Sequence, residues 1–325
     1  MGLNTKKFIN IIAGKWIILV FLIITVYFIL FTKSPANITL NNWYEATLYE
    51  KNNTIEVLQE LFKNSKHKFK EIQVYSIKGE PNINKTKDIL TVQFSGESIF
   101  KDPSQFDISF ISGKHTQNNI IPMPYMVWSI YLNQIDMHAF TRRRIFRGNN
   151  QKSFCLFSVS NPTNIKRNNF FTALSRYKTV DSCGKVMNNM GYSCPGVHYS
   201  SEFHKFISNY KFMICFENLS QENYLTEKLS NAYSYGTIPI YWGCPNIGDY
   251  INMSSILYLK PNYSEDDMNR LIKEIEILDN DDTLYRQKYE SIFFKDGVVP
   301  DAFDIGKIQN KIDSLVDKKL TEHNV

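Results

Sequence analysis

The most apolar stretch of the chain lies near its N-terminus. From Trp16 to Phe31 the sequence WIILVFLIITVYFILF holds no charge and one aliphatic hydroxyl group, that of Thr25. As a helix it would extend about 24 Å, slightly less than a typical hydrocarbon core of about 30 Å. Because all its faces are apolar, it does not fit a helix packed on a soluble domain. We therefore predict a transmembrane helix over residues 16–32.

A cleaved signal peptide is the closest alternative to an uncleaved anchor. The apolar region of a signal peptide is usually about 7–15 residues long and precedes a small-residue cleavage site, whereas FTKSPAN follows here. Lys6, Lys7 and Lys15 precede the apolar run, and only Lys33 follows it closely. The positive-inside rule then predicts a cytosolic tail over residues 1–15 and a type II membrane protein with a lumenal or external body.

The N-terminal half of this body alternates between helical and strand-like patterns. We expect a short stem over residues 33–53 and a helix over Thr54–Phe62, where apolar residues recur on one face. The runs KEIQVYSI, DILTVQF and FDISFIS read as strands, and the turn-rich GEPNINKTK separates the first two. This alternation predicts an α/β fold.

The C-terminal half shows the same rhythm more clearly. SFCLFSVSN is an apolar run with a polar end, and a helix is expected over Asn164–Tyr177. A helix over SSEFHKFISNY leads into the buried strand KFMICF. Asn223 or Thr226 can then cap a helix that runs to Tyr235 and stops at Gly236, before the strand TIPIYWG. Strand, helix and strand form a right-handed βαβ unit, and parallel strands covered on both faces explain the nearly continuous apolar runs.

The basic segment RRRIFRGNNQK, Arg142–Lys152, separates the two halves and is interpreted as a domain boundary. A phosphate-binding or membrane-binding patch is the alternative, although most charge runs are simply solvated. Over all 325 residues the formal net charge is +5, an excess too small to indicate a nucleic-acid partner. The composition, 43% apolar and 14% aromatic, supports a packed core and excludes a disordered chain.

The five cysteines show no zinc-ligand spacing. Cys155 and Cys215 lie in apolar strand-like runs and read as core residues. Cys183 and Cys194 flank a loop, where a disulfide is compatible with a lumenal body. With an odd number of cysteines, at least one is unpaired within the chain.

Charged residues gather where the strand KFMICF ends. Glu217 and Asn218 follow it, and Glu227 and Lys228 lie in the first turn of the next helix. In parallel sheets such positions converge on one crevice, and a helix N-terminus favours anions. Arg167 opens the helix after SFCLFSVSN and adds a second cation, while Glu227 suits ribose hydroxyls. The pattern indicates a nucleoside diphosphate site without a glycine-rich loop, the alternative being a surface ion pair with capping residues.

These segments resemble a known family. FENLSQENYLTEK followed by AYSYGTIPIYWG is similar to the donor-binding motif of the α1,3-fucosyltransferases, glycosyltransferase family 10. FSVSNPTNIKRNNFFTAL and YKFMICFEN extend the likeness, which covers about residues 153–260. In the N-terminal half it narrows to TVQFSGES and FDISF. The chain lacks the C-terminal paired cysteines of animal members and the long heptad tail of some bacterial ones.

The resemblance implies the GT-B arrangement of two facing Rossmann-like domains. Residues 54–150 would form the acceptor-side domain, residues 151–300 the GDP-fucose-binding domain and residues 301–325 a C-terminal helix or tail. The implied activity is transfer of L-fucose, with inversion, from GDP-fucose to a hydroxyl of a glycan acceptor, α1,3 to GlcNAc or Glc. The acceptor would be an oligosaccharide, glycoprotein or glycolipid, and the type II topology would place the enzyme in the Golgi.

The family's functional positions are matched one by one in this sequence. Glu97, in FSGES, matches the proposed general base, with a turn-capping residue as its alternative role and Glu217 as the next carboxylate to consider. Arg167 and Lys228 would hold the diphosphate, Glu227 the ribose and Tyr224 the sugar or base. The full set of implied donor-binding residues is Ser160, Arg167, Asn218, Tyr224, Glu227 and Lys228.

No cofactor is expected, and a divalent metal would at most stimulate, because side chains supply the positive charge. Asp279-Asn280-Asp281 has the spacing of a metal motif but follows EIEIL, so we interpret it as a polar helix end. Two alternatives to a fucosyltransferase stay open. One is a transferase that uses another nucleotide-sugar, and the other is a membrane-tethered protein that binds glycans or nucleotide-sugars without turnover.

Overall fold

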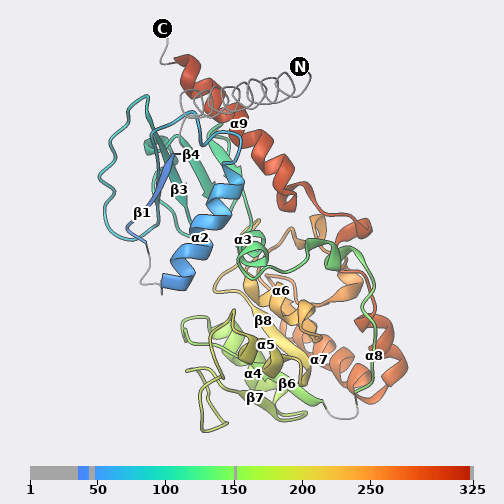
Figure 1. Cartoon of the computed structure of the whole chain (residues 1–325). Coiled ribbons are helices and arrows are strands. Elements are labelled where there is room, and N and C mark those ends of the chain that lie inside the picture. Colours follow the sequence, from blue (N-terminus) through green and yellow to red (C-terminus); the bar gives the residue numbers. More distant parts are fainter. Residues whose placement is uncertain (1–35, 44–47, 150–151, 323–325) are drawn as a thin grey trace, which may run out of the picture.

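The computed structural model describes residues 36–43, 48–149 and 152–322. The predicted cytosolic tail and transmembrane helix lie outside these residues. In the described part the chain forms two lobes, each built on a five-stranded sheet whose strand pairs are all parallel (Figure 1). This confirms the predicted α/β class. No helix within the described ranges is both long and apolar enough to cross a membrane.

The first lobe has the strand order β1-β2-β3-β4-β5. Its helices are α2 (Leu48–Leu61) and α3 (Tyr125–Leu132), the second of which faces the other lobe. The strands are β1 (Asn37–Asn41), β2 (Glu71–Tyr75), β3 (Ile89–Phe94), β4 (Ile108–Ile111) and β5 (Ile120–Pro122).

The stem prediction for residues 33–53 is wrong where the structure describes this segment. Residues 37–41 form β1, which pairs with β2 from Asn37 opposite Glu71. α2 begins at Leu48, six residues before the expected start at Thr54. β1 was missed because NITLN is a polar edge strand with one buried residue, Ile38, and so lacks the apolar run of an inner strand.

The second lobe has the strand order β10-β9-β8-β6-β7. The predicted βαβ unit is confirmed as β8, α6 and β9, and β8 is buried along its whole length. The strands are β6 (Ser153–Phe157), β7 (Val180–Ser182), β8 (Tyr210–Phe216), β9 (Ile238–Trp242) and β10 (Leu257–Tyr258). The helices are α4 (Ile165–Leu174), α5 (Ser201–Ile207), α6 (Glu227–Ser234), α7 (Glu265–Asn280) and α8 (Asp282–Tyr289).

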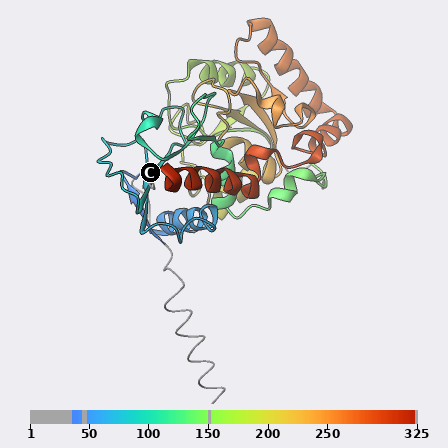
Figure 2. The same ribbon diagram turned by 90° about the horizontal axis from the view of Figure 1, so that it is seen from above.

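The last helix, α9 (Ile305–Glu322), returns to the first lobe and lies beside α2 (Figures 1 and 2). Gln309 donates a hydrogen bond of 2.8 Å to the carbonyl oxygen of Glu60 at the end of α2. Lys319, 7% exposed, forms an ion pair of 2.6 Å with Asp107 beside β4. The C-terminal segment is therefore a helix that completes the first lobe.

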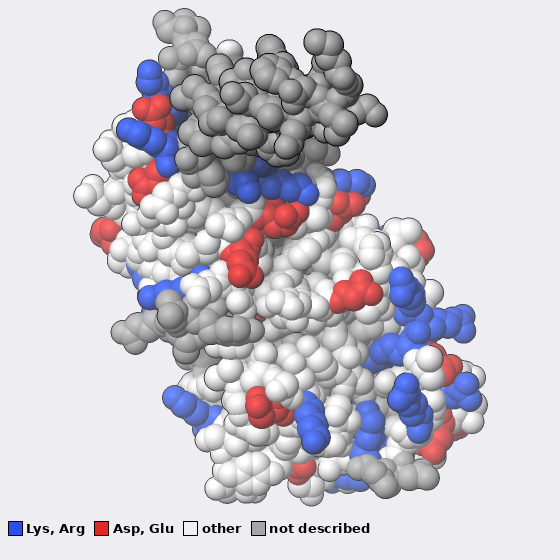
Figure 3. All heavy atoms as spheres, viewed as in Figure 1, with Lys and Arg blue, Asp and Glu red and all other residues white. Residues whose placement is uncertain are grey.

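The basic segment after residue 141 is already part of the second lobe. Phe140 packs against Tyr233 and Phe293, so the chain crosses between lobes upstream of the predicted boundary. Arg144 lies between the rings of Tyr233 and Tyr289, 3.9 Å from each centroid, and donates to three carbonyl oxygens of the second lobe. The neighbouring arginines are exposed, and basic side chains gather along the edge where this segment runs (Figure 3).

A buried ion pair ties α7 to the sheet. Asp279, whose side chain is 2% exposed, lies 2.8 Å from the ammonium groups of both Lys211 on β8 and Lys178. Burial alone raises the pKa of Asp279, but the two lysines outweigh it and hold that pKa below its ordinary value. The Asp279-Asn280-Asp281 motif is therefore a structural helix end, as interpreted from the sequence, and its first aspartate is buried.

We expect Asp279→Asn to lower the free energy of unfolding by about 3 kcal/mol at pH 7, because it leaves the Lys211 ammonium buried and unpaired. A depressed pKa in the folded state gives stability that is present above the unfolded pKa, about 3.9, and is lost as pH falls through the folded pKa. The gap between wild type and variant should therefore begin to narrow below about pH 4 in denaturant titrations. Lys178→Met, at a 51% exposed side chain, should cost below about 1 kcal/mol. A gap that did not narrow at all as the pH fell below about 4 would contradict this expectation.

Candidate active site

A cavity of about 570 Å³ opens between the two lobes. The loop after β3 and the helices α2 and α3 form its first-lobe wall. The ends of β6 and β8 and the start of α6 form the second-lobe wall, as expected for the carboxyl edge of a parallel sheet. All seven residues predicted from the sequence line this cavity: Glu97, Ser160, Arg167, Asn218, Tyr224, Glu227 and Lys228.

Arg167 lies beneath the cavity floor with only 1% of its surface exposed. Asn164 caps α4 by accepting from the Arg167 backbone N–H at 3.2 Å, which directs the arginine toward the end of β8. Its Nη1 donates to Asn218 Oδ1 at 3.2 Å, and its Nη2 donates to the carbonyl oxygen of Asn161. Its Nε has no partner among the described residues. The guanidinium thus supplies positive charge while holding Asn218 and residue 161 in place.

Lys228 places its ammonium group between two carboxylates at the start of α6. Its Nζ lies 3.2 Å from Glu217 Oε2, 2.9 Å from Thr226 Oγ1 and 3.4 Å from Glu227 Oε1. Lys228 and Glu227 keep 20% and 22% of their side-chain surface exposed. Burial lowers the pKa of Lys228, but the charges of Glu227 and Glu217 raise it above its ordinary value, so the group is cationic at neutral pH.

Glu227 is an anion beside this cation. Burial raises its pKa, but Lys228 first and His198 second outweigh burial and hold the pKa below its ordinary value. An ionised carboxylate at the cavity wall can accept hydrogen bonds from two hydroxyl groups. Lys228 and Glu227 therefore offer one positive and one negative group side by side, which suits a ligand with both anionic and hydroxyl groups.

Glu97 reaches the cavity from the opposite lobe. It follows β3 on a turn that Ser95 stabilises, and its Oε2 accepts a 3.2 Å hydrogen bond from the hydroxyl of Tyr224. Gly96 permits this path, because a Cβ there would lie 2.5 Å from the Tyr125 ring. Burial is the main cause that raises the pKa of Tyr224, so its hydroxyl stays protonated and donates. The Glu97 carboxylate therefore forms a hydrogen bond between the two lobes instead of capping a turn.

Glu217, the second carboxylate considered as a base, is unsuited to that role. It is fully buried and does not line the cavity. Its carboxylate accepts from the backbone N–H and hydroxyl of Thr226 as well as from Lys228. Burial raises the pKa of Glu217, against the opposing effect of Lys228. The Glu217 carboxylate is therefore not accessible from the cavity in this structure.

Several cavity residues were not predicted from the sequence. Asn231 is one helical turn after Glu227, so the spacing along α6 could have identified it. His198 and Tyr199 come from the irregular segment before α5, whose path no periodic pattern reveals. Trp43 and Tyr125 line the first-lobe wall.

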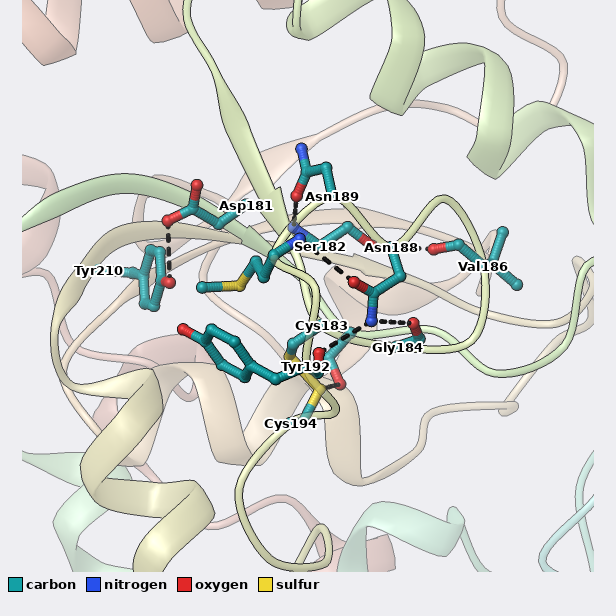
Figure 4. Close-up of a disulfide and its surroundings, with 12 residues drawn as sticks. Asp181, Ser182, Cys183, Gly184, Val186, Asn188, Asn189, Tyr192, Cys194 and Tyr210 are labelled. Atoms are coloured by element: carbon teal, nitrogen blue, oxygen red, sulfur yellow. Dashed lines mark hydrogen bonds between the residues drawn. A yellow bond between two sulfur atoms is a disulfide. The ribbon is translucent and has the colours of Figure 1, made fainter.

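A disulfide supports the wall formed by residues 158–161. Cys183 and Cys194 are bonded, and Figure 4 shows the intervening loop held by the Asn188 side chain, which donates to the carbonyl oxygens of Gly184 and Tyr192. Cys194 Sγ lies 3.1 Å from the hydroxyl of Ser158, a cavity residue. The pairing left open by the sequence is therefore present. Cys155, Cys215 and Cys244 are buried thiols.

Comparisons with known proteins agree with this architecture. Residues 148–291 match the family model described as glycosyltransferase family 10 (fucosyltransferase) C-term. The alpha-(1,3)-fucosyltransferase FucT of Helicobacter pylori is 38% identical over 107 residues, which are 33% of this chain and 21% of the relative. GDP-fucose protein O-fucosyltransferase 3 of Xenopus laevis is 35% identical over 130 residues, 38% of this chain and 27% of the relative. These alignments span only about a quarter of either relative.

Solved structures resemble the chain over most of its length. A crystal structure of an alpha1,3-fucosyltransferase superposes with a TM-score of 0.66 at 19% identity and covers 88% of this chain and 92% of that one. A structure of an alpha1,3-fucosyltransferase with GDP-fucose gives a TM-score of 0.63 at 21% identity with the same coverage. At these identities the likeness establishes the fold, the two-lobed GT-B arrangement with parallel sheets.

Proposed function

We propose that the protein is a fucosyltransferase that uses GDP-fucose, because residues 148–291 match the model for the C-terminal domain of glycosyltransferase family 10. It would move L-fucose, with inversion, to a hydroxyl group of a glycan. One observation carries the proposal: seven residues chosen from the sequence line one interlobe cavity, with a carboxylate facing the cationic cluster.

The donor would bind on the second lobe. Its diphosphate would lie at the start of α6, where Lys228 presents a partly exposed ammonium and the helix N-terminus favours anions. Arg167 and the N-terminus of α4 add positive potential from below. Glu227 would accept from the two ribose hydroxyls, and the base would extend toward His198 and Tyr199. These groups would neutralise the leaving diphosphate, so that a divalent metal would at most stimulate.

Glu97 would act as the general base on the acceptor side. Tyr224 engages its Oε2, which leaves Oε1 to take the proton of the acceptor hydroxyl. The acceptor oxygen would form its bond to C1 of fucose while the bond from C1 to the diphosphate breaks, and GDP would leave with the electron pair. Attack from the face opposite the diphosphate inverts C1. The hydroxyl of Tyr224 would orient the base through its 3.2 Å hydrogen bond to Glu97.

The first-lobe wall favours a sugar as the acceptor. Trp43 and Tyr125 are partly exposed rings near Glu97, and Asn53 adds a neutral amide. Aromatic faces pack on the apolar faces of pyranose rings, while amides pair with hydroxyls. We propose a glycan acceptor, in an oligosaccharide, glycoprotein or glycolipid, with α1,3 linkage to GlcNAc or Glc by analogy with the matched α1,3-fucosyltransferases.

The two alternatives are separable by assay. A transferase with another donor would release a different nucleotide from a donor panel. A binding protein without turnover would bind GDP-fucose but release no GDP with any acceptor. The shared hydrogen bond between Glu97 and Tyr224 favours an enzyme, because it orients a carboxylate that binding alone does not need.

We further propose a type II membrane protein with residues 34–325 in a lumen, most simply that of the Golgi. The apolar run Trp16–Phe31 and its preceding lysines motivate this topology. The Cys183–Cys194 disulfide supports it, because disulfides persist mainly in oxidising compartments.

Sealed microsomes from cells that express the full chain test the topology. The body should resist added protease until detergent opens the vesicles, and a tag at residue 1 should be removed in both conditions. Digestion of the body in intact vesicles would contradict the proposed orientation.

Lys228→Met should weaken GDP and GDP-fucose binding together by about 2–4 kcal/mol, because it removes the partly desolvated ammonium from the diphosphate site. Calorimetric titration of residues 34–325 would measure this loss. Lys260→Met, at a 57% exposed side chain outside the cavity, is the control and should bind as wild type does. Unchanged GDP affinity in Lys228→Met would remove Lys228 from the donor site.

Glu97→Gln should lower turnover by about 10²–10⁴-fold, the usual contribution of a general base, because the amide keeps the shape but not the basicity. GDP affinity and the unfolding temperature should stay near those of wild type. GDP release at saturating donor, measured across an acceptor panel, gives the turnover. A variant that retained more than about a tenth of wild-type turnover would show that Glu97 is not the base.

A further inference from the structure

We infer that Glu217 is a positioning residue that sets the Lys228 ammonium in the cavity and fixes the first turn of α6. The inference rests on the proposed function, in that the ligand of Lys228 is taken to be a nucleoside diphosphate. It assigns to Glu217 a role that acts through Lys228 and not through contact with the substrate.

The Glu217 carboxylate binds the N-cap residue of α6. This residue is Thr226, whose own side chain does not cap the helix. Glu217 Oε1 accepts from the Thr226 backbone N–H at 2.9 Å, and Oε2 accepts from the Thr226 hydroxyl at 2.8 Å. An anion supplied by the preceding strand thus stabilises the helix N-terminus, where negative charge is favoured.

The same carboxylate holds Lys228. Glu217 Oε2 lies 3.2 Å from Nζ, and the Thr226 hydroxyl lies 2.9 Å from it, so two fixed oxygens hold the ammonium from its buried side. Glu227, at 3.4 Å, is the most distant of the three partners, and its side chain, 22% exposed, lines the cavity. A bound diphosphate can therefore replace Glu227 at the ammonium while Glu217 keeps its place.

The neighbouring residues leave room for the Glu217 side chain and hold its backbone in place. Gly243, with φ of +153°, lies against it, and a Cβ there would be 2.6 Å from Glu217 Cγ. Asn164, the cap of α4, donates 2.8 Å to the Glu217 carbonyl oxygen, while the Glu217 N–H donates to Trp242 on β9. Because four elements meet at this residue, its carboxylate cannot move to a different partner without a rearrangement of the sheet edge.

A double-mutant cycle with Lys228→Met tests the inference in two readouts. Glu217→Gln alone should weaken GDP binding about tenfold to a hundredfold, because a charged hydrogen bond to the ammonium is lost. In the Lys228→Met background the same change should alter GDP affinity less than about threefold, since there is no ammonium left to position. Glu222→Gln, in the same loop but outside the cavity, is the matched control and should bind GDP normally.

The unfolding temperature gives the second readout. Glu217→Gln should lower it in the wild-type background and raise it in Lys228→Met, where the buried carboxylate has lost its counter-charge. If the single variant Glu217→Gln does not fold but the double variant with Lys228→Met does, that difference also demonstrates the coupling between Glu217 and Lys228. A helix-capping role independent of Lys228 would lower the unfolding temperature equally in both backgrounds.

Three results would overturn the inference. One is wild-type GDP affinity in Glu217→Gln, and another is an equal loss of affinity in both backgrounds. The third is a fall in turnover of 10²-fold or more at unchanged GDP affinity, which would indicate a base. A wild-type chain that did not bind GDP would contradict the proposed function instead, and the change of sign in the unfolding temperature would still decide the role of Glu217.

Discussion

Glu217 carries a fully buried carboxylate at the end of the central strand β8, and the cavity is arranged around it. Its side chain fixes Thr226 and Lys228 on α6, and its carbonyl oxygen fixes Asn164 on α4. The helices α4 and α6, which carry the cations Arg167 and Lys228, are thus both held in place by hydrogen bonds to Glu217 or to its neighbour in the cap, Thr226. A buried carboxylate is costly unless paired, so Lys228 stabilises the fold in addition to its proposed role in ligand binding.

The second constraint is the relative position of the lobes. The Met126 N–H on α3 donates to the carbonyl oxygen of Leu225, and the Gly113 N–H donates to that of Glu222. These backbone bonds hold the first lobe against the loop between β8 and α6, which is also the loop that carries Tyr224. The residues of the proposed donor site and the Glu97 carboxylate are therefore linked through these backbone bonds, although they belong to different lobes. α9 adds rigidity to the first lobe from outside.

The sequence predicts the second lobe better than the first. β8, α6 and β9 were recognisable because their strands are buried on both faces and the helix has clear ends. β1 escaped notice because it is a polar edge strand, and Arg144 because an arginine in a basic run resembles solvated charge. The burial of Glu217 depends on Gly243, which is distant along the chain. Sequence patterns report local periodicity, whereas these features arise from tertiary contacts.

The proposed function requires that the second lobe holds the donor while Glu97 faces it from the first. A crystal structure of residues 34–325 with bound GDP-fucose would test this arrangement. We expect the diphosphate at Lys228, the ribose at Glu227, and Glu97 on the face of fucose C1 opposite the diphosphate. A nucleotide bound elsewhere in the cavity, or Glu97 on the same face of C1 as the diphosphate, would contradict it.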